Sequence, residues 1–161
     1  MAKEAINKTN AMRILEKENI AFSVHTYDNN DGKIDGMSVA KKVGKDPELL
    51  YKTLVTVGAS KNYYVFVLCV TDELDLKKAA ASVGEKSVAM IPVAQINAVT
   101  GYIRGGCSPV GMKKKYKTVI SEDIILRDTV CVSGGKIGIQ LEIAPEDLCR
   151  AADATYADIV F

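Results

Sequence analysis

The two most apolar stretches of this chain lie almost next to each other. KTLVTVGA (52–59) and YYVFVLCV (63–70) are separated by three residues, Ser60-Lys61-Asn62, and this arrangement predicts a β-hairpin. Both stretches are apolar at nearly every position, whereas a half-buried strand is apolar at every second one. We therefore expect both faces of the hairpin to be covered, as in a central sheet or a closed barrel.

The segments on either side of the hairpin alternate irregularly between helical and extended patterns. Residue types and turn signals predict helices at about 9–17, 38–43, a short one that starts at Asp46, 74–83, just after 92, and 144–153. They predict strands at about 21–27, 87–91, 117–121, 128–134, 136–143 and 157–161. This order, with mostly tight turns, favours an α+β fold in which helices surround a mixed, barrel-like β-sheet. No composition break marks a linker, so we expect one domain over residues 1–161.

Charge and hydropathy exclude several classes of protein. No apolar run approaches the roughly 20 residues that a membrane-spanning helix needs. The start, MAKEAINKTN, has no apolar stretch of the kind found in a secretion signal, so a cytoplasmic protein is expected. The whole chain has a net charge of +1, which provides no global positive field for long nucleic acids. A small contact with one end of a nucleic acid stays open.

The four cysteines and the single histidine argue against a metal site. Cys69, Cys107, Cys131 and Cys149 are widely spaced, and no C-x-x-C pair is present. The cysteines of the two apolar runs, at positions 69 and 131, are expected to pack in the core as free thiols. We therefore expect neither a metal nor another cofactor.

The glycine-rich loop GGCSPVGMKKKY (105–116) raises the question of a nucleophile. A catalytic cysteine or serine needs a base, and His25 is the only histidine. Ser108 is followed directly by Pro109 and lacks the spacing of a nucleophile elbow. The loop is better suited to act through its backbone, directing N–H groups at a carbonyl or phosphate oxygen, or to be a plain structural turn. The lysines that follow could form a solvated face or guide a phosphate backbone.

Two charged residues lie in apolar surroundings. Lys52 opens the first strand of the hairpin, where it either reaches water or lines a pocket and meets an anion or a carbonyl oxygen. Glu142 lies in KIGIQLEI (136–143), on the face opposite the isoleucines. That face is either in solvent or forms the polar side of a pocket.

Two motifs in this order give the chain a family resemblance. KTLV (52–55) is followed about fifty residues later by GGCSPVGMKK (105–114), and with these motifs the chain resembles the YbaK/EbsC family over nearly its whole length. That family comprises free-standing relatives of the editing domain inserted in bacterial prolyl-tRNA synthetases. The resemblance implies an α+β editing domain that hydrolyses the ester between a wrong amino acid and its tRNA. GGCSP and the threonine after Lys52 resemble the branch that acts on cysteinyl-tRNA(Pro).

The resemblance also implies roles for individual residues. Lys52 matches the key active-site lysine, and the substrate's own thiolate would attack the ester. The substrate-binding positions that it implies are Tyr27, Thr53, Gly101, Gly105, Gly106, Ser108 and Glu142. Lys113, Lys114 and Lys115 would contact the acceptor end of tRNA(Pro), with prolyl-tRNA synthetase as a candidate partner. Two alternatives stay open: a deacylase for another small amino acid, such as alanine on tRNA(Pro), and a non-catalytic module that binds aminoacyl-tRNA or the synthetase.

Overall fold

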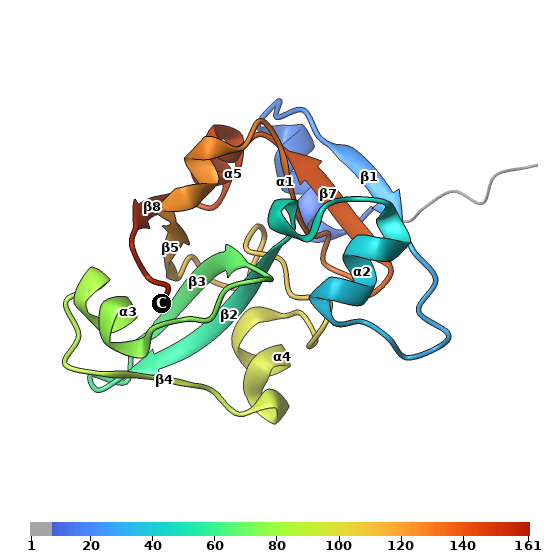
Figure 1. Ribbon diagram of the computed structural model, residues 1–161. Coiled ribbons are helices and arrows are strands. Elements are labelled where there is room, and N and C mark those ends of the chain that lie inside the picture. The colour runs from blue at the N-terminus through green and yellow to red at the C-terminus, as the bar shows by residue number, and fades with distance from the viewer. Residues whose placement is uncertain (1–7) are drawn as a thin grey trace, which may run out of the picture.

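The computed structural model describes residues 8–161, and helices and strands are mixed along the whole of this range (Figure 1). The α-helices are α1 (Asn10–Lys17), α2 (Gly36–Val43), α3 (Leu76–Ser82), α4 (Ile96–Thr100) and α5 (Pro145–Ala151). Short 3₁₀ turns are η1 (Pro47–Leu49), η2 (Val93–Gln95) and η3 (Glu122–Leu126). The strands are β1 (Ser23–Thr26), β2 (Tyr51–Gly58), β3 (Tyr63–Cys69), β4 (Val88–Met90), β5 (Lys117–Ser121), β6 (Val130–Ser133), β7 (Ile139–Ile143) and β8 (Ala154–Ala157).

The predicted hairpin forms the centre of the larger sheet. β2 and β3 pair antiparallel from Tyr51 opposite Cys69 to Val57 opposite Tyr63. The sheet has five strands in the order β4-β2-β3-β5-β8, and β5 is parallel to both of its neighbours, so the sheet is mixed as predicted. The α+β class is therefore confirmed.

A second, smaller sheet corrects the expectation of one barrel-like sheet. β1, β7 and β6 form a separate antiparallel sheet in that order. The two sheets meet at a single parallel bridge between Leu50, just before β2, and Cys131 of β6. Because only this bridge joins them, the strands of residues 8–161 do not close into a barrel.

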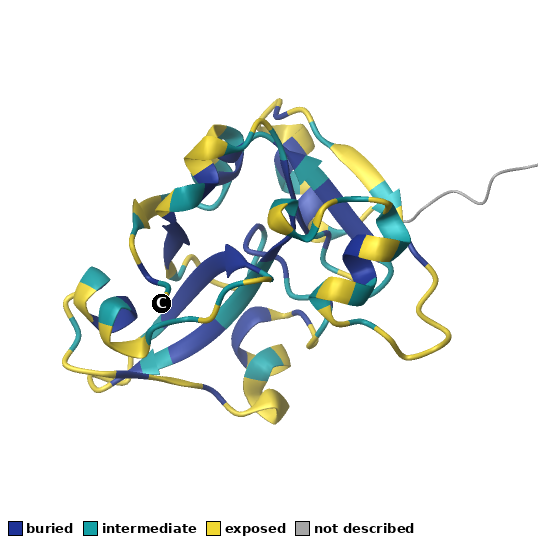
Figure 2. Cartoon of the chain, in the orientation of Figure 1, coloured by how far each residue is buried: buried dark blue, intermediate teal, exposed yellow. Residues whose placement is uncertain are grey.

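Both faces of β3 are buried, as the continuous apolar run predicted (Figure 2). Val67 and Cys69 pack in a core shared with α1, α5 and the small sheet. Phe66 and Leu68, on the opposite face, pack against α3 and β4. β3 is thus a wall between two apolar cores, and this burial explains why it contains no charged residue. β2 is less covered than predicted, because residues 52–54 and Val57 are only partly buried.

The predicted cap of the first helix is confirmed, and the predicted position of the last strand is wrong. Thr9 caps α1 as expected, because its Oγ1 accepts a hydrogen bond of 3.2 Å from the Met12 N–H. The last strand is Ala154–Ala157, not 157–161. Ile159 is fully buried in the core that contains Phe66 and Leu68, so the last residues pack there. They form one isolated β-bridge, between Leu74 and Val160.

Within residues 8–161, no helix has both the length and the apolar character needed to cross a membrane. The expectation that residues 1–10 are not a secretion signal concerns a segment that falls mostly outside the described residues.

Candidate functional site

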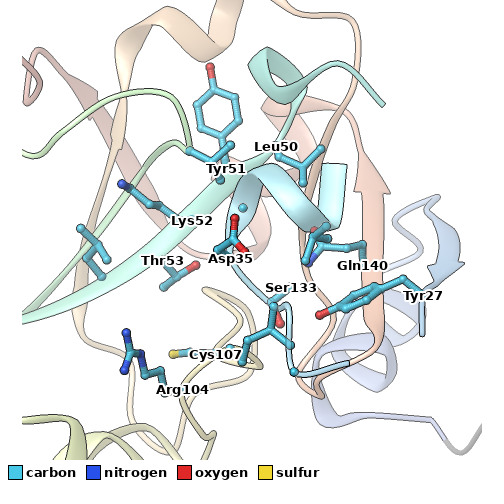
Figure 3. A pocket seen from close by; sticks show the side chains of 17 residues that line it. Tyr27, Asp35, Leu50, Tyr51, Lys52, Thr53, Arg104, Cys107, Ser133 and Gln140 are labelled. Atoms are coloured by element: carbon cyan, nitrogen blue, oxygen red, sulfur yellow. The ribbon is translucent and has the colours of Figure 1, made fainter. Parts of the chain in front are cut away.

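A cavity of about 590 Å³ lies where the two sheets meet. Its walls come from the start of β2, the segment that leads into α2, the loop after α4, and the facing ends of β6 and β7 (Figure 3). This volume is within the range of small-molecule sites in proteins. Segments far apart in the sequence therefore build one concave surface.

Lys52 lies on one side of this cavity, on the second residue of β2. Its Nζ donates a hydrogen bond of 2.9 Å to the backbone carbonyl of Asp72. None of the ion pairs formed within residues 8–161 involves Lys52. The Asp72 carboxyl is also close enough for the Lys52 charge to act on its pKa, but the two side chains form no ion pair. Because its hydrogen-bond partner is an uncharged carbonyl, Lys52 can still stabilise negative charge in the cavity.

The neighbouring Thr53 carries a polar atom without a partner. Its Oγ1 is buried and makes no hydrogen bond within residues 8–161, and Figure 3 shows it pointing toward the interior of the cavity. A buried hydroxyl that stays unpaired costs about 1–3 kcal/mol. A ligand group that reaches Thr53 would remove this cost, so the position favours binding of a polar ligand.

The opposite wall is polar as well. Tyr27 follows β1, is 9% exposed, and directs its hydroxyl toward the side of Ser133 (Figure 3). Gln140 of β7 is 8% exposed and also lines the cavity. Asp35 caps α2, and hydrogen bonds from the Ser38 hydroxyl and N–H hold the pKa of its carboxyl below the usual value. The cavity therefore presents an ammonium group on one side and a carboxylate on another.

The glycine-rich loop contributes backbone to the cavity, as expected. Gly105 lines it with φ at +85°, a conformation that side chains rarely adopt. The Gly106 N–H is used within the loop, where it donates to the Ile103 carbonyl at 2.9 Å. Neither the Gly105 nor the Cys107 N–H donates to a protein group within residues 8–161. Two loop donors beside the cavity are therefore free for a ligand.

Cys107 lines the cavity but is poorly suited to be a nucleophile. Burial raises the pKa of its thiol to about 11, even though a hydrogen bond with Thr100 acts in the opposite direction. The thiolate is the reactive form, and only a minute fraction exists at neutral pH. His25, the only possible histidine base, is not among the residues of the cavity wall.

Some of the predicted site residues do not reach the cavity. Gly101 ends α4 with φ at +84°, and Ser108 is fully buried with its Oγ accepting from the Val110 N–H. Gly106 packs against the backbone of residues 136–137, beside the cavity wall.

Glu142 lies outside the wall. Its carboxylate accepts hydrogen bonds from Thr129 and His25 and pairs with Lys45. These contacts, led by those from Thr129 and His25, lower the pKa of Glu142 to about 2.

The lysine run lies on a different side of the loop from the cavity. Lys113 donates from Nζ to the Ala98 carbonyl at 3.2 Å. Lys114 and Lys115 line a separate hollow of about 110 Å³, next to Pro109 and Ile14 of α1. A contact between this run and a nucleic acid remains a prediction, and it would be made away from the cavity itself.

Sequence reasoning missed four polar residues of the cavity: Asp35, Arg104, Ser133 and Gln140. Arg104 precedes the recognised glycine motif by one residue and has no motif of its own. Gln140 lies two residues before Glu142 and therefore on the same face of the strand, but only Gln140 lines the cavity.

The argument from cysteine spacing overlooked a cluster that the small sheet creates. Ligand atoms of His25, Cys131 and Glu142 lie within 4.8 Å of one another, because β1, β6 and β7 bring them side by side. Burial raises the pKa of the Cys131 thiol to about 11, and Glu142 is already paired with Lys45. Wide spacing along the chain therefore did not keep these three potential ligand atoms apart.

A family model and a curated relative indicate one family, and two solved structures share the fold. The model of the aminoacyl-tRNA editing domain matches residues 36–151. A protein of Enterococcus faecalis, named as a Cys-tRNA(Pro)/Cys-tRNA(Cys) deacylase, EbsC, is 39% identical over 98% of this chain and 96% of its own length. A solved structure described as a trans-editing enzyme for prolyl-tRNA synthetase has a TM-score of 0.84 at 24% identity, covering 94% of this chain and 95% of that one. A solved hypothetical protein has a TM-score of 0.87 at 20% identity, covering 95% and 100%.

Proposed function

This chain belongs to the aminoacyl-tRNA editing domain family, and from that premise we propose that it is a trans-editing deacylase for mischarged Cys-tRNA(Pro). Residues 1–161 would act as one editing domain. Editing of this kind is needed because a binding pocket separates side chains of similar size by only about 1–3 kcal/mol.

The observation that carries the proposal is a cavity with an unpaired lysine but no activated nucleophile. The Cys107 thiol is held protonated by burial, and His25 bonds to Glu142 outside the cavity wall. A site of this kind suits a substrate that brings its own nucleophile. Cysteine esterified to tRNA does so, because its thiol is close to the ester carbonyl.

In the proposed reaction, the substrate sulfur attacks the ester carbonyl carbon. A C–S bond forms, the C–O bond to the ribose breaks, and the thiol proton ends on the released ribose hydroxyl. The products are free tRNA and a cysteine thiolactone, which water then opens to cysteine. The protein needs only to hold the ester and stabilise the negative charge that develops on its carbonyl oxygen.

The residues of the cavity divide these tasks between them. Lys52 and the free N–H groups of Gly105 and Cys107 would face the carbonyl oxygen, where negative charge develops. The ionised Asp35 carboxylate would attract the ammonium group of the amino acid. The unpaired Thr53 hydroxyl would contact the small side chain or the ribose.

Selection of the correct tRNA requires more surface than the cavity offers. The net charge of +1 supports a grip on the acceptor end alone. We propose prolyl-tRNA synthetase as the partner that delivers the tRNA. Adding the synthetase should lower the KM for Cys-tRNA(Pro), and an unchanged KM would argue against that partnership.

The experiment that tests the function uses tRNA(Pro) charged separately with cysteine, S-methylcysteine, alanine and proline. Hydrolysis of the cysteinyl ester alone supports the proposal, because S-methylation blocks only the attacking sulfur. Equal hydrolysis of the S-methylated ester would refute attack by the substrate thiol. Preferential hydrolysis of the alanyl ester would assign the other substrate, and tight binding without any hydrolysis would indicate a binding module.

A further inference from the structure

Three loop segments converge at the glycine pair beside the cavity. A Cβ atom on Gly105 would lie 2.7 Å from Ile34 Cδ1 and 3.4 Å from Ile137 Cγ1. A Cβ atom on Gly106 would lie 2.9 Å from the Ile137 backbone nitrogen. Because only glycine permits this approach, the loop that starts at Arg104 and the turn at Lys136 lie against each other.

This convergence places two basic residues beside the glycine pair, one in the cavity wall and one next to it. The Lys136 Cα lies 3.1 Å from the position of a Gly106 Cβ, so its side chain starts beside the glycine pair. Arg104, the residue before that pair, lines the cavity itself, and Figure 3 shows it on the same side as Lys52. Both Arg104 and Lys136 are exposed.

These two cations differ from most others near the site in having no acidic partner. Within residues 8–161, Lys42 pairs with Asp31 and Lys45 with Glu142, but no ion pair includes Arg104 or Lys136. Lys33 is close enough to Asp31 to help lower the pKa of that carboxyl, so its charge is partly compensated. Besides Lys52, Arg104 and Lys136 are therefore the basic residues beside the glycine pair that have no ion-pair partner within residues 8–161.

We propose that Arg104 and Lys136 bind backbone phosphates of the single-stranded 3′ end of the charged tRNA. The inference rests on the proposed function, which places the aminoacyl ester inside the cavity. The nucleotides that precede the ester must then leave through the edge of the cavity, and their phosphates are its nearest anions. A guanidinium group can bind a phosphate through two parallel hydrogen bonds, and an ammonium group supplies a point charge.

A truncated substrate tests this role separately from the chemistry. Cysteine esterified to adenosine has the reactive ester but no phosphate. Arg104→Ala and Lys136→Ala should each raise the KM for Cys-tRNA(Pro) about three- to tenfold, with kcat nearly unchanged, and should raise the KM for cysteinyl-adenosine much less. Lys77→Ala is the matched control, because Lys77 is an exposed lysine of α3 that does not line the cavity. Equal losses on both substrates would overturn the phosphate role.

Binding measured without hydrolysis keeps the inference testable if the proposed reaction is wrong. The probe is a fluorescent, uncharged RNA oligonucleotide that ends in CCA, and its anisotropy is followed from low to high salt. Each phosphate contact that is lost should reduce the slope of log K against log salt by about 0.7. Arg104→Lys should keep the slope while losing part of the affinity. An unchanged affinity and slope in both alanine variants would refute the inference, whatever the enzyme hydrolyses.

Discussion

His25 Nε2 lies 2.8 Å from Glu142 Oε1, a contact that joins β1 to β7 in the small sheet. With Thr129 and Lys45, this contact keeps Glu142 ionised far below the pH at which a glutamate normally takes up a proton. The pair lies outside the cavity, so its first consequence is for stability.

Acid should destabilise the protein through Glu142. Its pKa falls from an ordinary 4.5 to about 2 on folding, so the unfolded chain takes up the proton first. The stabilisation is complete above about pH 5 and is lost as the pH falls toward 2; it amounts to on the order of 3 kcal/mol. In urea unfolding at several pH values, Glu142→Gln should flatten this part of the profile. Glu73→Gln, which alters an exposed glutamate, should not. A parallel profile for Glu142→Gln and the native protein would contradict this account.

Cys107→Ala should keep the deacylase activity within about threefold, because a thiol with a raised pKa is not the attacking group. Single-turnover hydrolysis of Cys-tRNA(Pro) measures this. Iodoacetamide should also label Cys107 slowly at pH 8. Loss of activity in a folded variant, together with a trapped thioester on the native enzyme, would show that Cys107 is a nucleophile.

Lys52→Ala should lower the rate of hydrolysis about a hundred- to a thousandfold, which corresponds to the ~3–4 kcal/mol of one preorganised donor in a water-poor site. Lys52→Arg should restore little, because the broader guanidinium does not fit the position of a compact ammonium group. Single-turnover rates should be compared with circular dichroism spectra to show that both variants fold. A folded Lys52→Ala enzyme with a native rate would remove Lys52 from the mechanism.

Replacing Lys113, Lys114 and Lys115 with alanine should weaken tRNA binding and its salt dependence while the rate at saturation stays close to native. The run borders a separate hollow and not the cavity, so it can act only on binding. Titrating tRNA at two salt concentrations checks this. A fall in the saturated rate with unchanged affinity would be the opposite result.

Local patterns in the sequence predicted most of the fold. The continuous apolar run of β3 predicted its burial on both faces, whereas β2 is only partly buried at residues 52–54 and Val57. Thr9 supplied a recognisable helix cap. The last strand was misplaced because its pairing is decided by β5 and not by its own composition. Thr155 and Tyr156 are exposed yet pair with β5, whereas the more apolar Ile159 is buried without extending the strand.

Site residues that belong to a sequence motif could be predicted. Site residues that only the folded chain brings to the cavity could not. Lys52, Thr53 and Gly105 belong to the two motifs and line the cavity. Arg104 and Asp35 do not stand out in the sequence, because a surface arginine and a helix-capping aspartate are ordinary residues. They line the cavity only because the two sheets meet there, and no local pattern in the sequence encodes that meeting.

The order of the walls along the chain has a consequence for protein synthesis. The cavity needs Tyr27 from the first strand and Gln140 from the seventh, and the two sheets meet only when Leu50 pairs with Cys131. Long-range pairings of this kind form late, because the intervening chain must first be closed into a loop. A nascent chain on the ribosome therefore has no complete cavity until β7 has emerged. The two facing walls are thus made at different times, with residues 28–139 synthesised between Tyr27 and Gln140.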